Sequence, residues 1–400
     1  MNGSTNNIEK SDHIYDVIVI GAGVIGSSTA YWLTKDDVDT LVIEQYNNPN
    51  PLGSSHGHVR IVQVAYESNL SYYEHFVPES LRLWSQLEKE TGTTIFRKCG
   101  FLTMCPTKKT FDDMKDSMTS SNLEHTVYET SRDTERDFPM FTIEEDMSAV
   151  LEHGAGTLHP DTATKAFQTM AKKQGATFHY SERVKDIQPG DVISVTTDKG
   201  QYRCRHLVIT VGPWAPTFCQ KLGLDLKIQP TRVTIQYWQK KDVNDPRFKN
   251  VPGFTFPRAV EGKYHIYGAP LADFPNLVKV TVHTGPEFDP EEADMVIDDW
   301  SIKAVGGIIR KYIPGLHDTP QYVHRCVYSN TPDGNYIIDR HPKYDNIVIG
   351  AGFSGHGFNT SPVTGRQLSD LAQGKQPQDD ISLFKIDRFD NQTEDNKTED

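Results

Sequence analysis

The hydrophobic pattern contains two similar motifs near opposite ends of the chain. Residues 16–35 pass from an apolar run, Val17 to Ile20, through the turn GAGVIG into a helical pattern. Because the run is apolar without alternation, it predicts a strand that is covered on both faces. Residues 346–374 repeat the order of strand, glycine turn and helix. We therefore expect one structural layer that is built from both ends of the chain.

The middle of the chain predicts a different architecture. Amphipathic helical patterns such as residues 76–92 lie between residues 70 and 150, and short strand patterns at the spacing of a meander follow them. Between residues 228 and 285 the strand patterns alternate, which predicts an antiparallel sheet with one solvent-exposed face. Residues 325–340, RCVYSNTPDGNYIIDR, hold two apolar runs around a Pro-Asp-Gly turn and predict a hairpin.

Length, charge and cysteine content narrow the class of protein. The 400 residues are enough for two packed domains. No apolar run approaches the roughly 20 residues of a membrane span, and a net charge of -13 without a basic tract disfavours nucleic acid as a partner. The five cysteines have no C-x-x-C spacing, so they predict neither a disulfide framework nor a metal site.

Both ends of the chain are polar. The N-terminus lacks the apolar core of a secretory signal, and the C-terminus ends in Thr-Glu-Asp rather than in a peroxisomal address. We therefore expect a cytoplasmic protein with disordered tails at residues 1–13 and 391–400.

Gly21, Gly23 and Gly26 form the spacing G-x-G-x-x-G at the start of the first predicted helix. In a dinucleotide site such glycines allow a tight turn, let the backbone approach a pyrophosphate, and let the helix pack closely on the strand. The helix N-terminus adds N–H groups and a positive dipole end. Glu44 closes the next predicted strand, about 20 residues further on, where a carboxylate binds ribose hydroxyls and repels a 2′-phosphate. The pattern predicts an FAD or NAD site.

The remaining motifs favour FAD. Nicotinamide dehydrogenases usually continue with consecutive βαβ units, whereas this chain inserts strand meanders before it returns to the first layer. Four segments follow in order: GSSHGHVRIVQVAYE (53–67), LVKVTVHTG (277–285), CVYSNTPDGNYIID (326–339) and GFSGHGF (352–358). With these segments the chain resembles, over residues 14–390, the sarcosine oxidase and N-methyltryptophan oxidase family of covalent-FAD amine oxidases, in the D-amino-acid-oxidase superfamily.

The resemblance implies the fold class and a division into domains. We expect an α/β protein in which a Rossmann-type FAD-binding domain is interleaved with an antiparallel-sheet substrate domain. The FAD-binding domain would take residues 14–70, 145–225 and 320–390, and the substrate domain would take residues 71–144 and 226–319. A monomer that binds a small-molecule amine and O2, and no membrane, is expected.

Cys326 heads the segment in which this family attaches its flavin. The resemblance implies a covalent bond from the Cys326 sulfur to the flavin 8α-methyl group. Such a bond needs a thiolate, which the neighbouring Arg325 would favour. The alternative is that Cys326 is a small buried apolar residue.

The resemblance also implies catalytic roles for four residues. Lys279 would act near flavin N5 in the reaction with oxygen, and His283, on the same face of the predicted strand, would lie beside the substrate amine. Tyr267 would line the substrate pocket, and the Arg60 guanidinium would lie against the flavin. The alternative for Lys279, His283 and Arg60 is a solvent-exposed position.

The other cofactor-binding candidates come from the same segments. The glycines of GFSGHGF would bring backbone N–H groups close to the flavin pyrimidine ring. The cofactor-binding candidates are Gly21, Gly23, Val24, Ile25, Gly26, Glu44, Ser54, Ser55, His56, Arg60, Cys326, Gly352, Gly355, His356, Gly357 and Phe358.

Two positions depart from the family pattern. The family binds the substrate carboxylate with an arginine three residues after the Arg60 position and a lysine directly after GHGF, and here these positions are Gln63 and Asn359. A carboxylate buried without a cation costs roughly several kcal/mol, whereas amides still bind neutral polar groups. We therefore expect a secondary or N-methyl amine other than simple sarcosine, unless another cation binds the carboxylate.

Three other functions remain open at this point. The imine could be trapped internally, which would give an oxidative ring closure in specialised biosynthesis. The enzyme could be a dehydrogenase that passes electrons to another acceptor, although Lys279 favours an oxidase. A flavoprotein without activity is the third alternative, and His283 and Lys279 disfavour it.

Overall fold

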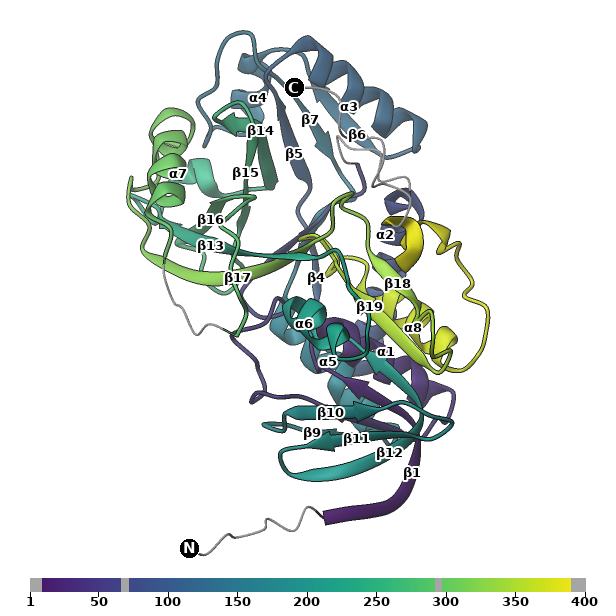
Figure 1. The fold of residues 1–400 in the computed structure, drawn as a ribbon. Coiled ribbons are helices and arrows are strands. Elements are labelled where there is room, and N and C mark those ends of the chain that lie inside the picture. The colour runs from purple at the N-terminus through teal and green to yellow at the C-terminus, as the bar shows by residue number, and fades with distance from the viewer. Residues whose placement is uncertain (1–8, 66–71, 292–296, 390–400) are drawn as a thin grey trace, which may run out of the picture.

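The computed structural model describes residues 9–65, 72–291 and 297–389, and its strands form three sheets (Figure 1). The predicted C-terminal tail and residues 1–8 lie outside the described residues. The first strand begins at Glu9, so residues 9–13 of the predicted N-terminal tail belong to that strand. Among the helices of the described part, none has both the length and the apolar character of a membrane span.

The first sheet is assembled from both ends of the chain, as the sequence predicts. Its central strand β1 pairs in parallel with β2 and β12, and β12 pairs in parallel with β19. The strands are β1 (Glu9–Ile20), β2 (Thr40–Ile43), β9 (Thr177–His179), β10 (Val184–Gln188), β11 (Ile193–Thr197), β12 (Gly200–Ile209), β18 (Ile337–Arg340) and β19 (Ile347–Ala351). Strands β10, β11 and β12 form the predicted meander.

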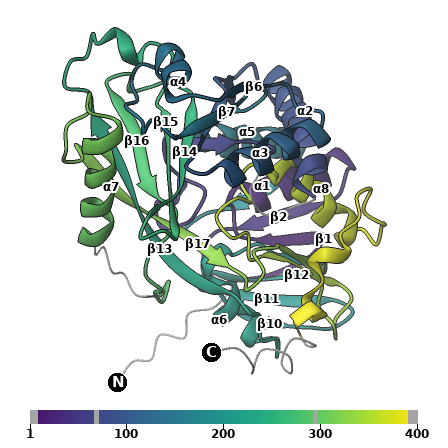
Figure 2. The same cartoon turned by 90° about the horizontal axis from the view of Figure 1, so that it is seen from above.

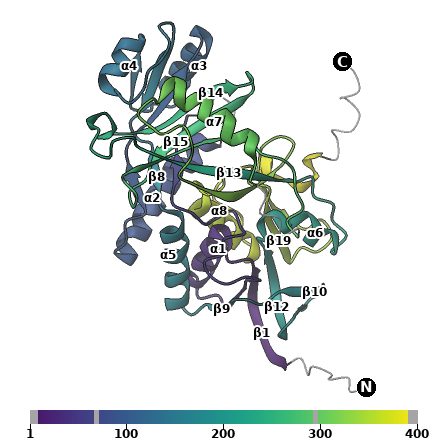
Figure 3. The same ribbon diagram turned by 90° about the vertical axis from the view of Figure 1, so that its left-hand side faces the viewer.

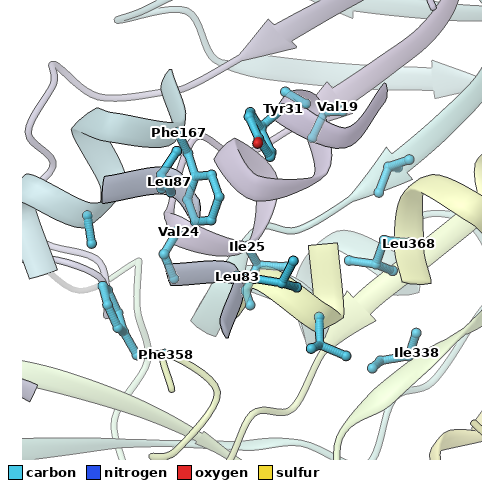
Figure 4. Close-up of a cluster of buried hydrophobic side chains, with 14 of the residues drawn as sticks. Val19, Val24, Ile25, Tyr31, Leu83, Leu87, Phe167, Ile338, Phe358 and Leu368 are labelled. Atoms are coloured by element: carbon cyan, nitrogen blue, oxygen red, sulfur yellow. The ribbon is translucent and has the colours of Figure 1, made fainter. Parts of the chain in front are cut away.

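Helices cover both faces of the first sheet. Val17 and Val19 pack against helices on one face, while Ile18 and Ile20 pack on the other, so β1 is covered on both sides. Figure 4 shows side chains that converge on the first face from four helices. These helices are α1 (Val24–Lys35), α2 (Tyr73–Thr91), α5 (Pro160–Lys173) and α8 (Ser361–Ala372), and the short α6 (Ala215–Gln220) lies on the opposite face.

The second sheet contains the strands predicted between residues 228 and 285. Its order is β17-β13-β16-β15-β14-β5-β7-β6. The strands are β5 (Phe101–Cys105), β6 (His125–Tyr128), β7 (Ser148–Glu152), β13 (Gln229–Gln239), β14 (Gly253–Val260), β15 (Tyr264–Pro270), β16 (Leu277–Val282) and β17 (Tyr322–Asn330). Three helices accompany this sheet, namely α3 (Lys108–Ser120), α4 (Ser131–Asp137) and α7 (Asp299–Tyr312).

The prediction of one solvent-exposed face for this sheet is wrong. Helix α7 runs beside β13 and β16 and buries one face (Figure 2). On the other face Lys279 and Thr281 are also buried. The alternation of apolar and polar residues therefore marks a face that is polar but largely buried. The candidate catalytic residue Lys279 lies on this face.

A third, small sheet joins the two parts. Strand β8 (Gly156–Leu158) pairs with β3 (Arg60–Val62) on one side and with β4 (Phe96–Lys98) on the other. In the side view, α7, β14 and β15 lie toward one end of the molecule and β1 and β12 toward the other (Figure 3). Strand β3 of this small sheet begins at Arg60, and Gln63 follows its last residue.

The predicted hairpin at residues 325–340 does not form. Strand β17 pairs with β13 in the second sheet, whereas β18 pairs with β19 in the first. The chain does turn as predicted, with the Thr331 hydroxyl donating to the Asn335 carbonyl at 2.7 Å. Turn chemistry specifies the reversal but not the partner of each strand, because pairing depends on residues distant in sequence. The segment therefore crosses between sheets.

The division into domains stays a prediction. Strands β7 and β17 fall within the segments assigned to the FAD-binding domain, yet both pair in the second sheet. Helix α2 falls within the predicted substrate domain, yet it packs on the first sheet.

Candidate active site

The glycine turn between β1 and α1 is tightly packed. Gly21 has a φ of +99°, a conformation that side chains rarely adopt, and a Cβ there would collide with the Thr210 carbonyl oxygen. A Cβ on Gly26 would collide with the carbonyl oxygen of Gly21. The predicted close approach of strand, turn and helix is therefore present.

Glu44 lies where β2 ends, directly beside this turn. Its carboxylate accepts the N–H of Ala22 at 2.9 Å and that of Tyr46 at 3.0 Å. Burial raises the pKa of Glu44, although these backbone N–H groups oppose the shift. The N–H of Val24 donates to the Ser55 hydroxyl at 2.9 Å, so the predicted GSSHG segment contacts the helix N-terminus.

A cavity of about 370 Å³ extends from the glycine turn and Glu44 to Cys326 and Tyr328. Three buried polar atoms on its wall have no hydrogen-bond partner among the described residues, namely Trp214 Nε1, Thr164 Oγ1 and His56 Nε2. Unpartnered buried polar groups are costly and point to a polar ligand. A long ligand with phosphates and hydroxyl groups, such as FAD, fits this combination of glycine turn, carboxylate and unpaired polar groups.

Arg60 organises the wall of this cavity near Cys326. Its guanidinium donates to the carbonyl oxygens of Ser54 at 2.9 Å, His56 at 2.7 Å and Val59 at 3.0 Å. The Arg60 Nη2 atom lies 3.9 Å from Cys326 Sγ, and its guanidinium carbon lies 5.6 Å from the centre of the Phe358 ring. The predicted GSSHG and GHGF segments therefore meet at the cysteine.

The cation beside the Cys326 thiol is Arg60 and not Arg325. Adjacent residues of a strand point to opposite faces, and the Arg325 guanidinium lies 5.7 Å from the Phe288 ring centre. The expectation that Arg325 is the cation beside the Cys326 thiol is therefore wrong, because Arg60 takes that place. Sequence adjacency suggested Arg325, whereas Arg60 reaches the thiol from a different strand.

Lys279 lies on the enclosed face of β16. Its side chain is 2% exposed, and its ammonium nitrogen lies 4.7 Å from the centre of the Tyr267 ring. Burial, followed by the positive charge of Arg60, lowers the pKa of Lys279 to about 7. Lys279 is therefore a mixture of charged and neutral forms near neutral pH.

His283 follows β16 on the same face, as predicted. Its ring centre lies 5.5 Å from that of Tyr267 and 5.0 Å from that of Tyr328. His283 is exposed, in contrast to Lys279, and loss of solvation beside the neighbouring groups lowers the pKa of its ring to about 4. At neutral pH this ring is uncharged and can accept a hydrogen bond.

Tyr328 is a residue of this cluster that we did not predict. Its hydroxyl lies 3.0 Å from that of Tyr267, and burial raises its pKa well above the ordinary value. The sequence signal was available, because Tyr328 is two residues after Cys326 and so lies on the same face of the strand. Trp214 and Thr164 had no comparable local signal.

The segment GFSGHGF closes the cavity beside Tyr328. Gly355 has a φ of +83°, and a Cβ there would lie 3.0 Å from the Tyr328 ring. The His356 ring lies 3.0 Å from the Tyr336 hydroxyl through Nδ1, and burial, followed by the nearby His283, lowers its pKa to about 3. Gly355, Gly357 and Phe358 line the cavity.

Gln63 and Asn359 directly follow two of the predicted cofactor-binding segments, since Gln63 is three residues after Arg60 and Asn359 comes after Phe358. Gln63 follows the strand that carries Arg60, and its buried Oε1 has no hydrogen-bond partner among the residues described. Asn359 is 4% exposed, and its carbonyl oxygen accepts the Trp84 indole N–H at 3.3 Å. Within the described part of the chain, no hydrogen bond joins either amide side chain to Lys279, Tyr267 or His283.

Comparison with known proteins decides the family. A family model described as "FAD dependent oxidoreductase" matches residues 16–371. The chain belongs to this family. It is 36% identical over 388 residues to a peroxisomal sarcosine oxidase of Mus musculus, covering 94% of this chain and 96% of that one. It is 32% identical over 387 residues to a monomeric sarcosine oxidase of Bacillus sp. (strain NS-129), covering 94% and 97%.

A solved structure supports the same fold. NikD, described as an unusual amino acid oxidase essential for nikkomycin biosynthesis, superposes in its open form with a TM-score of 0.82 at 24% identity, over 94% of this chain and 98% of NikD. The predicted membership of this family of FAD-dependent amine oxidases and the predicted α/β fold class are therefore confirmed. The roles of the individual site residues stay predictions.

Proposed function

We propose that this FAD-dependent oxidoreductase is an oxidase of a secondary or N-methyl amine that lacks a free carboxylate. The C–N bond of the amine is oxidised to an imine, which water hydrolyses, and O2 is reduced to hydrogen peroxide. The observation that carries the proposal is the cluster of Lys279, His283, Tyr267 and Tyr328 beside Cys326, with neutral amides at positions 63 and 359.

FAD supplies the acceptor for a hydride equivalent from the carbon next to the amine nitrogen, and it passes the electrons to O2. We propose that Glu44, the glycine turn and Ser55 hold its nucleotide end and that Cys326 binds it covalently. The nearby guanidinium of Arg60, whose Nη2 lies 3.9 Å from Cys326 Sγ, holds a hydrogen-bond donor beside the sulfur that would bind the flavin.

The protein side chains favour a neutral amine. Arg60 is positively charged and Lys279 is partly charged at neutral pH, and among the described residues no carboxylate contributes to the pKa shift of Lys279. An ammonium ion would be repelled here, whereas a neutral amine can accept a hydrogen bond from the Tyr267–Tyr328 hydroxyl pair. His283, uncharged above a pKa of about 4, adds no positive charge and can accept a hydrogen bond from the amine N–H.

Lys279 provides a positive charge for the reaction with oxygen. Electron transfer to O2 creates negative charge, and a preorganised ammonium in a dry site stabilises that charge. The burial of Lys279 and its contact with the Tyr267 ring hold the ammonium in one position.

Gln63 and Asn359 support a substrate without a carboxylate. Their amides donate and accept hydrogen bonds but carry no charge, and Gln63 Oε1 is a buried acceptor without a partner in the described residues. A hydroxyl, an N–H or a carboxamide on the substrate would satisfy it. That the protein acts as a cytoplasmic monomer remains our prediction from the sequence.

The test is anaerobic reduction of the flavin by a panel of amines, followed by absorbance in a stopped-flow instrument. The panel pairs N-methyl and secondary amines with analogues of equal size that carry a carboxylate. We expect carboxylate-free amines to reduce the flavin at least about 10-fold faster at equal concentration, since each lost ionic contact is worth about 1.5–3 kcal/mol. Equal rates with sarcosine would refute the substrate class, and no reduction by any amine would refute the proposed function.

A further inference from the structure

A buried carboxylate stands behind the segment that carries Gln63. Glu152 is the last residue of β7 and is 1% exposed. Its carboxylate accepts the N–H of Val64, at 3.0 Å to Oε1 and 3.2 Å to Oε2, and the N–H of Ala65 at 3.2 Å to Oε2. Two consecutive backbone N–H groups, directly after Gln63, are therefore held by one side chain.

The surroundings of Glu152 are apolar and contain no cation that pairs with it in the described residues. Phe101 on β5 and His125 on β6 lie opposite Glu152 in the register. The His125 ring is engaged with the Leu123 carbonyl oxygen at 2.7 Å. Around Ala65 the packed side chains are Cys105, Phe111, Met114, Met118 and Val150. Burial raises the pKa of Glu152 to about 7, against the opposing effect of the two N–H groups.

A carboxylate buried in this way lowers the stability of the folded protein, so its hydrogen bonds should have a structural role. Burying it without a cation destabilises the folded protein, and an apolar residue of similar size would pack without that cost. What Glu152 contributes is a fixed backbone geometry, because its charge-assisted hydrogen bonds to both N–H groups define the direction in which the chain leaves β3. Gln63, one residue before Val64, has its position set by these bonds.

We propose that Glu152 is a positioning residue for substrate binding, which fixes the backbone at Val64 and Ala65 and thereby holds the Gln63 amide in the substrate pocket. This inference rests on the proposed function, in which Gln63 contacts the amine substrate. It also predicts that substrate affinity depends on pH. A protonated Glu152 keeps one carbonyl acceptor but turns an O–H toward the second N–H, so the segment loses one of its bonds.

The chain offers a matched control. Glu88 on α2 also accepts two consecutive backbone N–H groups, those of Ile95 at 2.6 Å and Phe96 at 2.8 Å. These residues lead into β4, which is separated from β3 by β8. The substitution Glu88→Gln removes the charge that strengthens the same kind of bond, without touching the Gln63 segment.

The experiment compares wild type, Glu152→Gln and Glu88→Gln as holoenzymes with the best amine of the panel. We expect Glu152→Gln to raise KM at least about 10-fold, to change kcat less than about 3-fold, and to leave reoxidation by O2 unchanged, while Glu88→Gln lowers thermal stability but leaves KM unaltered. In the wild type KM should rise as pH falls through about 7, and in Glu152→Gln this rise should be smaller, because only Lys279 and the amine still titrate there. An unchanged KM in Glu152→Gln, or an equal rise in both variants, would overturn the inference.

A second measurement does not depend on activity. Hydrogen–deuterium exchange of the peptide that contains Val64 and Ala65, corrected for intrinsic rates, should be faster in Glu152→Gln by about 10-fold and unaltered in Glu88→Gln. If Glu152→Gln does not fold, the same peptide in the wild type should lose protection between about pH 8 and pH 6, and constant protection would overturn the inference. A wild type that oxidises no amine would refute the proposed function, whereas a normal wild type with an unperturbed variant refutes only the role of Glu152.

Discussion

Replacement of Lys279 by methionine should stabilise the protein while it impairs the reaction with oxygen. The side chain is 2% exposed, and its pKa is lowered from 10.5 to about 7 by burial and then by Arg60. A difference of about 3.5 pKa units corresponds to about 5 kcal/mol, which is the upper bound for the cost of keeping the ammonium charged in this site. Methionine has a similar length and carries no charge, so Lys279→Met removes that cost.

The sign of the pH dependence follows from proton binding. Between about pH 7 and the ordinary value of 10.5, the unfolded state binds a proton at Lys279 that the folded state does not. The stability of the wild type therefore rises with pH in this window, and the full cost applies below about pH 7. Lys279→Met should raise the melting temperature most at about pH 6 and progressively less toward about pH 10.

Two assays test this prediction on the holoenzyme. Thermal melts across this pH range measure stability, with Lys172→Met on α5 as a control at a more exposed lysine whose pKa is also lowered by burial. Stopped-flow mixing of reduced enzyme with O2 should show reoxidation slowed by about 10²- to 10³-fold in Lys279→Met, the usual effect of losing one preorganised electrostatic contact. Anaerobic reduction by amine should change much less. A variant that reoxidises at the wild-type rate, or that melts lower than wild type at about pH 6, would refute the reasoning.

Three further variants, one of them a double substitution, test the rest of the site. Cys326→Ala should release free FAD on acid precipitation, whereas the wild type should keep its yellow colour in the pellet, and colour retained by the variant would contradict the covalent attachment. The double substitution Gln63→Arg with Asn359→Lys should lower KM for sarcosine by about 10- to 100-fold, because it restores two cationic hydrogen-bond donors; a control with Gln63→Met and Asn359→Leu should not. Tyr328→Phe should lower the rate of flavin reduction by amine about 10-fold, because it removes the 3.0 Å contact with the Tyr267 hydroxyl; an unaltered rate would remove Tyr328 from the proposed mechanism.

Features that depend on short stretches of sequence were predictable. The strand, glycine turn and helix at residues 16–35 form as expected, because the apolar run, the three glycines and the helical pattern each act within a few residues. The position of Glu44 beside the turn follows from the same local unit. The return of the chain to this layer at β19 was also predictable, since the motif is repeated there.

Features that depend on distant partners were not predictable from the pattern. Lys279 and Thr281 alternate with apolar residues and so suggest a solvent-exposed face, but both are buried in the fold, and Arg60 from β3 lies close enough to Lys279 to lower its pKa. Arg325 stood beside Cys326 in the sequence, while Arg60, 266 residues away, stands beside it in space. Glu152 is a single acidic residue at the end of a short apolar run, and only the fold brings it to the N–H groups of Val64 and Ala65.

Strand β17 explains why Cys326, the proposed covalent anchor, lies where the two large sheets meet. A hairpin would have kept Cys326 and residues 337–340 in one sheet. Because β17 pairs with β13 and β18 pairs with β19, the intervening turn connects the enclosed face of the second sheet to the nucleotide layer. Cys326 and Tyr328 then share one face with Lys279, and Arg60 reaches them from the small third sheet. A cofactor attached at Cys326 would therefore lie beside residues of all three sheets, with the proposed amine-binding residues on the same face as its anchor.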